Sequence, residues 1–148
     1  MSVVPALDGV ATVGEWFIPG GAHNEAALGL YQRASAALMG RKSYEGFLGY
    51  WPAQEGPWAD TFNPMPKYVA SRTLEGPLEW SSTLIEGDLA DAVTQLKGEL
   101  DGDLVLVGTG ELARNALEAG LVDELWFWVH PVVWGEGARP YEGVQPGL

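Results

Sequence analysis

The chain has 148 residues, with 8 lysines and arginines against 20 aspartates and glutamates, so its formal net charge is −12. Its hydrophobic fraction of 47% suffices for one buried core, which excludes global disorder. So few basic residues argue against a nucleic-acid partner. The absence of cysteine excludes disulfides and thiolate chemistry, and no apolar run approaches the roughly 20 residues of a membrane span. We expect one soluble, cytoplasmic domain.

The expected elements follow one another in short succession, because glycine and proline punctuate the chain. In chain order they are a strand at 3–7, a helix over 23–37, an apolar run at 36–39, a helix from about residue 43, a loop at 49–66, strands at 67–71 and 83–85, a helix over 88–100, a strand at 104–107, a helix over 111–119 and a β-type segment at 125–133. Ser43 and Asp88 are the expected N-caps. Strands alternating with helices predict an α/β fold with a largely parallel sheet.

One glycine-rich segment stands directly after the buried strand at 104–107 and directly before a helix. It contains Gly108, Thr109 and Gly110. Glycine lets the backbone approach a ligand closely, and a helix start offers N–H groups to an anion. The acidic residue of a dinucleotide fingerprint, about 20 positions further on, is missing. A phosphate-binding turn and a tight turn that needs glycine for steric reasons therefore both stay open.

Two further segments have a related pattern. Gly40 ends a strand, and Arg41 and Lys42 are the only adjacent basic pair in the chain. Cations at a helix start repel its positive dipole end unless an anion lies between them, which favours an anion site. Ser71 and Arg72 follow a third strand, and they suit a phosphate monoester. In a parallel sheet we expect all three segments at one edge, where ligands of open α/β sheets bind.

Candidate catalytic and substrate-binding residues lie in the first half of the chain. His23, Asn24 and Glu25 open the first helix, where His23 or Glu25 could transfer a proton, although ordinary helix capping explains them as well. Trp51 and Trp58 lie in a proline-rich segment. They either anchor it or form a stacking wall for a flat heteroaromatic substrate. Two lone histidines without clustered carboxylates make a metal site unexpected.

Seven segments in one order carry a resemblance to a known family. They are ALDG at 6–9, LMGRKSYE at 38–45, YWP at 50–52, KYVASRT at 67–73, LVGTGEL at 106–112, AGLVDEL at 119–125 and HPVV at 130–133. The chain resembles the dihydrofolate-reductase-like family, in particular the bacterial branch similar to the C-terminal reductase domain of riboflavin-biosynthesis deaminase–reductases. The resemblance covers nearly the whole chain. It implies a single α/β domain with a mixed, mostly parallel central sheet flanked by helices.

The resemblance also implies NADPH as the cofactor and assigns its site residue by residue. Ala6 and Leu7 match the strand that lies beside the nicotinamide. The residues that match the phosphate-binding and adenosine-binding segments are Gly40, Arg41, Lys42, Ser43, Ser71, Arg72, Gly108, Thr109, Gly110, Glu111 and Leu112. These coincide with the three segments at which charge and helix starts already favour an anion.

Three departures from the family limit this assignment. Its folate-reducing members carry a carboxylate early in the first helix, and that place falls on Asn24, so dihydrofolate reduction itself is not expected. Glu25 and His23 remain beside it, and a carboxyl buried at Glu25 would have a raised pKa suited to proton donation. The first strand is short at its N-terminus. The family's final β-hairpin is short or absent within residues 1–148.

The resemblance implies a function that we state as an expectation: an NADPH-dependent reductase of a small, flat, conjugated or heterocyclic substrate, pterin-like, pyrimidine-like or a secondary metabolite. Asp8, Trp51 and Trp58 are the expected substrate contacts, although Asp8 could instead only fix its turn. The alternative is a non-redox nucleotide-binding or ligand-binding protein, or a repurposed enzyme of secondary metabolism on the same fold.

We also expect a homodimer. The chain stops before its sheet should close, and the strand with Trp126 and Trp128 has apolar residues on both faces. Members of the family that resemble this chain are often dimers as well.

Overall fold

The computed structural model describes residues 1–11, 15, 17, 20–139 and 142. Its strands are β1 (Ser2–Val3), β2 (Ala34–Gly40), β3 (Lys67–Ala70), β4 (Ser82–Leu84), β5 (Asp103–Val107) and β6 (Trp126–Phe127). Its helices are α1 (Ala22–Arg33), α2 (Arg41–Leu48), α3 (Pro57–Phe62), α4 (Leu89–Glu99) and α5 (Glu111–Glu118), with a 3-10 turn, η1 (Trp51–Ala53), before α3.

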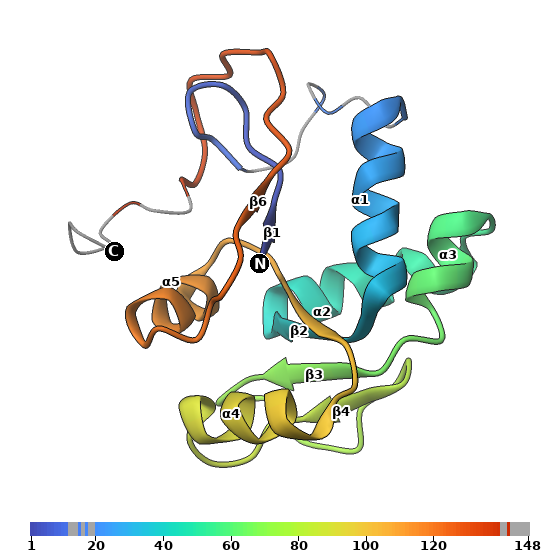
Figure 1. Ribbon diagram of the computed structural model, residues 1–148, viewed down its shortest axis with the longest axis vertical. Helices are drawn as coiled ribbons and strands as arrows, with labels where there is room; N and C mark the ends of the chain where they lie inside the picture. The colour runs from blue at the N-terminus through green and yellow to red at the C-terminus, as the bar shows by residue number, and fades with distance from the viewer. Residues whose placement is uncertain (12–14, 16, 18–19, 140–141, 143–148) are drawn as a thin grey trace.

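Within the described residues the six strands form one sheet in the order β4-β3-β2-β5-β1-β6, and every strand pairing is parallel. Figure 1 shows β1 and β6 side by side, on the far side of the sheet from β4. This is the single-domain α/β architecture that the alternation of strands and helices predicts. In the part of the chain described here, no helix has the length and apolarity to cross a membrane.

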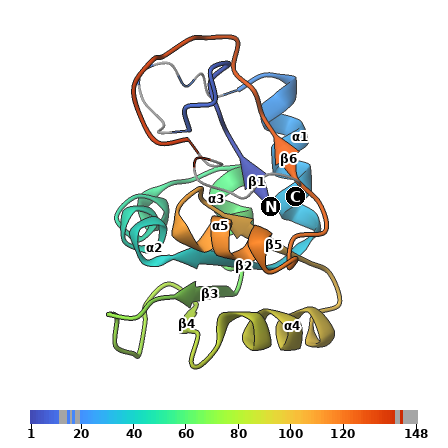
Figure 2. The same cartoon turned by 90° about the vertical axis from the view of Figure 1, so that its left-hand side faces the viewer.

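The central strands separate two apolar cores, because successive side chains of a strand point to opposite faces. Met39 and Val107 pack with residues of α1, α2 and α3, whereas Leu38 and Leu106 pack with residues of α4 and α5. Figure 2 shows α1 and α4 on opposite sides of β2 and β3. The sequence therefore reads as continuous apolar runs in these strands, since both faces are covered.

Helix starts follow the expectation in one case and depart from it in another. The Asp88 carboxylate accepts hydrogen bonds from the backbone N–H groups of Ala90 and Asp91, at 2.8 and 3.2 Å, as an N-cap should. The assignment of Ser43 as an N-cap is wrong. Strand β2 continues directly into α2, so Gly40 occupies the cap position and Ser43 is the third helical residue.

Several expected boundaries also shift. The first helix ends at Arg33 rather than at 37, because the next residues enter the sheet, where Ala36 and Ala37 are fully buried. The segment 49–66 is not a simple loop, since it contains η1 and α3, each with a proline in its first turn.

The first and the last expected strands along the chain are shorter than the sequence predicts. In place of the strands expected at 3–7 and 125–133, the structure has the two-residue strands β1 and β6. An isolated parallel bridge between Ala6 and His130 follows them. Pro5 and Pro131 stand beside this bridge, and a proline has no N–H with which to continue a ladder.

Candidate functional site

The carboxyl ends of three neighbouring strands meet at one edge of the sheet. Strand β2 lies between β3 and β5, with Gly40 opposite Ala70 and Met39 opposite Val107. The segments that leave these strands are 40–43, 71–73 and 108–112, which are the three segments singled out from the sequence. Their predicted convergence on one edge therefore holds in the structure, and we call this the carboxyl edge.

The first and third of these segments pack against each other. Gly108 has a φ of +110°, and a Cβ atom placed there would lie 2.8 Å from the Ser43 Oγ atom. A Cβ atom at Gly40 would lie 3.9 Å from the Cβ of Leu112. Position 108 thus requires glycine both for its backbone conformation and for its space. The glycine of each turn thus lies against a side chain of the other, and the two turns form one surface.

Two helices begin at this surface. Helix α2 starts after Gly40 and α5 after Gly110, and neither start has a hydrogen bond from a capping side chain. The first N–H groups of a helix have no partner inside the helix, and they carry the positive end of its dipole. The N–H groups at both starts are therefore suited to donate hydrogen bonds to the oxygens of an anion.

The second segment joins the other two through an ion pair. Ser71 Oγ accepts hydrogen bonds from the N–H groups of Thr73 and Leu74, at 3.1 and 3.0 Å, which folds a tight turn after β3. Arg72 projects from this turn, and its Nη2 atom lies 3.1 Å from Oε1 of Glu111. The carboxyl edge of β2 is thus spanned by a contact between the turn after β3 and the start of α5.

The charge at this edge is unusual for a chain with a net charge of −12. Arg41, Lys42 and Arg72 are three exposed cations beside two helix starts. Arg41 lies 3.9 Å from Glu45 on the following helical turn. Guanidinium, ammonium, hydroxyl and backbone N–H groups together form a donor set that fits phosphate groups.

A second group of predicted residues surrounds Trp58 in the first turn of α3. Its indole Nε1 donates a hydrogen bond to Oδ1 of Asn24, over 3.0 Å. The Trp58 ring lies 6.3 Å from that of Trp51 and 5.2 Å from that of Tyr31, between ring centroids. The structure thus brings Asn24, Trp51 and Trp58 into one half-buried aromatic group, which fits both loop anchoring and a stacking wall.

The other two candidates in the first turn of α1 lie differently. Glu25 is exposed, so the expected burial of its carboxyl is wrong. His23 is exposed too, and its ring forms a T-shaped contact with the buried His130 ring, at 5.2 Å between centroids. Among the described residues, no group of three or more histidines and carboxylates is placed to hold a metal ion.

Asp8 connects two distant parts of the chain. Its Oδ2 atom accepts a hydrogen bond from the Gly135 N–H over 2.7 Å, and this bond lowers the pKa of the Asp8 carboxyl. Arg139 donates from Nε to the Asp8 carbonyl over 3.2 Å. These contacts fit the alternative that Asp8 fixes its turn. Nearby, Ala6 is buried whereas Leu7 is 65% exposed.

Sequence reasoning missed one buried charge. Lys67, the first residue of β3, is only 1% exposed. Its Nζ atom donates hydrogen bonds to the carbonyls of Asn63 and Met65, at 3.1 and 2.6 Å, and lies 4.0 Å from the centre of the Trp80 ring. Burial lowers the pKa of Lys67 to about 8. The sequence pattern could have indicated this burial, because Lys67 stands two residues before the buried Val69 and therefore lies on the same face of the strand.

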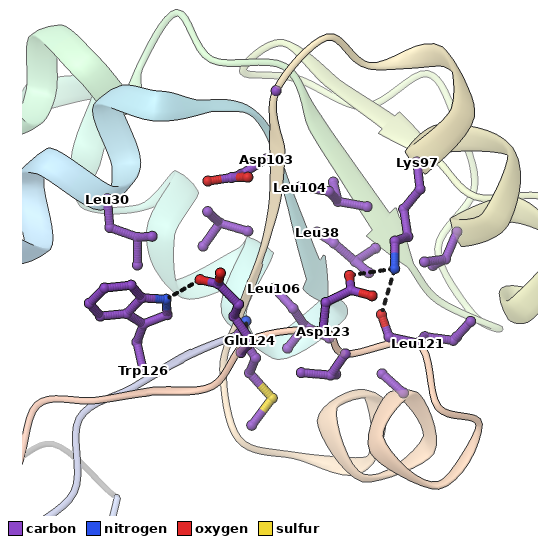
Figure 3. Close-up of a pocket in the computed structure, with 16 residues that line it drawn as sticks. Leu30, Leu38, Lys97, Asp103, Leu104, Leu106, Leu121, Asp123, Glu124 and Trp126 are labelled. Atoms are coloured by element: carbon purple, nitrogen blue, oxygen red, sulfur yellow. Dashed lines mark hydrogen bonds and ion pairs between the residues drawn. The ribbon is translucent and has the colours of Figure 1, made fainter.

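A cavity of about 240 Å³ lies at the opposite edge of the sheet, where β1, β5 and β6 begin (Figure 3). Leucines form much of its wall. At its rim, Lys97 Nζ lies 2.5 Å from Oδ2 of Asp123, and the Trp126 indole donates to Glu124 over 3.1 Å. None of the predicted site residues lines this cavity. It is therefore separate from the carboxyl edge.

Comparison with known proteins gives a consistent result. The family model of the RibD C-terminal domain matches residues 1–147. An uncharacterized protein of Bacillus subtilis (strain 168), YyaP, is 33% identical over 105 residues. That alignment covers 68% of this chain and 55% of YyaP, so the chain spans about half the length of this curated relative.

Two solved structures have a similar fold. A protein of Shewanella sp. PV-4, provisionally assigned to riboflavin biosynthesis, superposes with a TM-score of 0.75 at 22% identity, over 94% of this chain and 80% of that one. A pyrimidine reductase-like protein of Corynebacterium diphtheriae gives a TM-score of 0.54 at 14% identity, over 90% of this chain and 74% of that one. At these identities the likeness establishes the fold.

Proposed function

The chain belongs to the family of the RibD C-terminal domain, and from this premise we propose that it is an NADPH-dependent reductase of a small, flat, conjugated or heterocyclic substrate. Membership of the family implies a reductase-like function of the riboflavin or pyrimidine type. The cofactor, the substrate and the residues that serve them are the proposed part.

One observation carries the proposal: the three segments at 40–43, 71–73 and 108–112 meet at the carboxyl edge. Gly108 packs directly against Ser43, and Arg72 contacts Glu111, so residues far apart in the sequence form one surface. The place where a side chain would begin at Gly108 is taken by the Ser43 hydroxyl, so glycine is what lets the turns at 40–43 and 108–112 approach each other closely. This surface suits the phosphates of a dinucleotide in charge, in donor chemistry and in backbone access.

The residues at this edge would divide the binding as follows. The turns at 40–43 and 108–112 would hold the pyrophosphate with backbone N–H groups of the two helix starts. Ser71 and Arg72 would bind the 2′-phosphate side of the adenosine, where a guanidinium can make two parallel hydrogen bonds. NADPH, when bound, supplies the hydride. The protein's part is to position both reactants and to exclude water.

For the substrate we propose the aromatic group of Trp51 and Trp58. The hydrogen bond to Asn24 fixes the orientation of the Trp58 ring, so that it can stack against a flat substrate. The amide of Asn24 has no ionisable proton to give to the reduced substrate. Glu25, His23 or a water molecule would supply the proton that completes reduction of a C=N, C=O or C=C bond.

Calorimetric titration with NADPH and NADH, followed by NADPH oxidation against a panel of pterins and pyrimidines, tests the proposal. Gly108→Ala is the decisive variant, because the new Cβ would meet the Ser43 hydroxyl. We expect it to weaken NADPH binding by about tenfold or more. Gly98→Ala, within α4 and with open space around its Cβ position, is the matched control. Circular dichroism establishes that both variants are folded.

A second function is favoured by one specific residue, Asn24, which stands where folate-reducing relatives carry a carboxylate. A protein that binds NADPH without oxidising it against any substrate of the panel would be a non-redox nucleotide-binding protein on the same fold. A wild-type chain that binds neither NADPH nor NADH would contradict the proposed function.

A further inference from the structure

The ion pair between Arg72 and Glu111 combines two groups that dinucleotide sites ordinarily use for opposite purposes. In such sites an arginine accommodates the 2′-phosphate of NADPH, whereas a carboxylate accepts a hydrogen bond from the 2′-hydroxyl of NADH. Here the two side chains lie 3.1 Å apart, between Nη2 and Oε1. They come from the turn after β3 and from the start of α5 after β5, the two segments that flank the end of β2.

We propose that Glu111 is a cofactor-specificity residue: its carboxylate weakens the binding of NADPH and so reduces the factor by which NADPH binds more tightly than NADH. This inference rests on the proposed function. A 2′-phosphate that approaches Arg72 must first separate the guanidinium from its carboxylate partner, and then lie beside a second negative charge. The ribose of NADH meets no such repulsion, and the same carboxylate can accept from its hydroxyl.

The surroundings of the pair fit this role. Both side chains are solvent-exposed, at 86% for Arg72 and 61% for Glu111, so the pair is free to separate when a ligand arrives. Exposed ion pairs stabilise a fold only weakly. Arg41 is associated with Glu45, at 3.9 Å, on the helix that starts beneath the pair. Within the part of the chain that the structure describes, Glu111 is the carboxylate paired with Arg72, so it is the one that a phosphate bound at Arg72 would meet.

The experiment compares dissociation constants of NADPH and NADH for the wild type, Glu111→Gln, Arg72→Gln and the double variant. Glu111→Gln retains the size of the side chain and removes its charge. We expect NADPH to bind about two- to tenfold more tightly to this variant, with NADH unchanged or weaker. Arg72→Gln should weaken NADPH alone. The double variant should bind NADPH more tightly than Arg72→Gln alone, because Glu111→Gln removes the repulsion of the 2′-phosphate.

Glu118→Gln is the matched control, since Glu118 is an exposed carboxylate at the far end of the same helix. It removes one negative charge from the chain and should leave the ratio of the two dissociation constants unchanged. An equal change for NADPH and NADH in Glu111→Gln, or no change, overturns the specificity role while leaving the proposed function intact. Absence of binding by the wild type to either nucleotide overturns both.

Discussion

The side-chain oxygen of Asn24 accepts a hydrogen bond from the indole nitrogen of Trp58 over 3.0 Å, which joins the first turn of α1 to the first turn of α3. The two residues are 34 positions apart in the sequence. Asn24 is thus an acceptor that holds an aromatic ring. A carboxylate oxygen can accept the same bond.

Asn24→Leu should lower the free energy of unfolding by about 0.5–1.5 kcal/mol, because it removes one hydrogen bond and leaves the indole N–H unpaired. Asn24→Asp should retain most of this stability. With any substrate that the panel identifies, Asn24→Leu should raise KM while the dissociation constant of NADPH stays the same. Urea unfolding and steady-state kinetics measure the two effects. An unchanged KM would exclude Trp58 from the substrate wall.

Glu25→Gln tests the proton donor. If Glu25 protonates the substrate, this variant should lower kcat by ~10²-fold or more, with unchanged NADPH binding. The structure leaves the Glu25 side chain exposed rather than buried. His23→Ala, two positions earlier in the same helical turn, should change kcat only slightly. Full activity of Glu25→Gln across mildly acidic and mildly basic pH would assign the proton to water or to another group.

Asp8→Asn should act on stability rather than on cofactor binding. The Gly135 hydrogen bond holds the pKa of Asp8 below its ordinary value of 3.8. A carboxyl whose pKa is lower in the folded state stabilises the fold above pH 3.8, and this stabilisation is lost as the pH falls through the folded-state value. As the pH falls from 5 to 3, the free energy of unfolding measured in urea should therefore decrease less in Asp8→Asn than in the wild type. Equal losses would contradict the assignment.

The convergence of the three segments that follow β2, β3 and β5 could be predicted, because local pattern and topology determine it together. A buried strand followed by glycine and a helix start is visible in the sequence at Gly40 and at Gly108, and parallel pairing places all such segments at one edge. The contact of Arg72 with Glu111 was beyond sequence reasoning, since it depends on β2 lying between β3 and β5.

Boundaries were less predictable where tertiary packing overrides local preference. Alanine favours helix, yet Ala36 and Ala37 belong to a central strand because both are buried between two layers. Proline suggested a loop at 49–66, although proline is compatible with the first turn of a helix, as Pro57 shows. Lys67 was expected only as the first residue of a strand, and a period of two places it in the core with Val69.

Lys67 should make stability depend on pH in the alkaline range. Its pKa falls from 10.5 in the unfolded chain to about 8 in the folded protein. The unfolded chain therefore holds the proton more tightly, and the free energy of unfolding should rise as the pH increases from about 8 toward 9.5. Lys67→Met should remove this rise, whereas Lys42→Met, at an exposed lysine, should preserve it. If the free energy of unfolding of the wild type does not change over this pH range, the lowered pKa of Lys67 is contradicted.

The measurements stop short of pH 10 because of Tyr31. Burial raises the pKa of Tyr31 to about 12, which lowers the free energy of unfolding as the pH rises further.

The chain should form a homodimer through the surface around β6. Trp126 is 38% exposed and Val129 52% exposed, and the Trp126 ring stacks on that of Trp128 at 5.9 Å between centroids. An exposed apolar surface of this kind favours self-association. Because two chains of net charge −12 repel each other, added salt should tighten the dimer by screening that repulsion.

Light scattering at micromolar concentration measures the mass, at low salt and at high salt. Val129→Asp places a charge in the exposed apolar surface and should yield a folded monomer, since a desolvated carboxylate without a partner is costly at an interface. Thr83→Asp adds the same charge at an exposed position of β4, at the other edge of the sheet, and should remain dimeric. A wild-type monomer at both salt concentrations contradicts the dimer. A dimer that survives Val129→Asp and dissociates in Thr83→Asp would move the interface to β4.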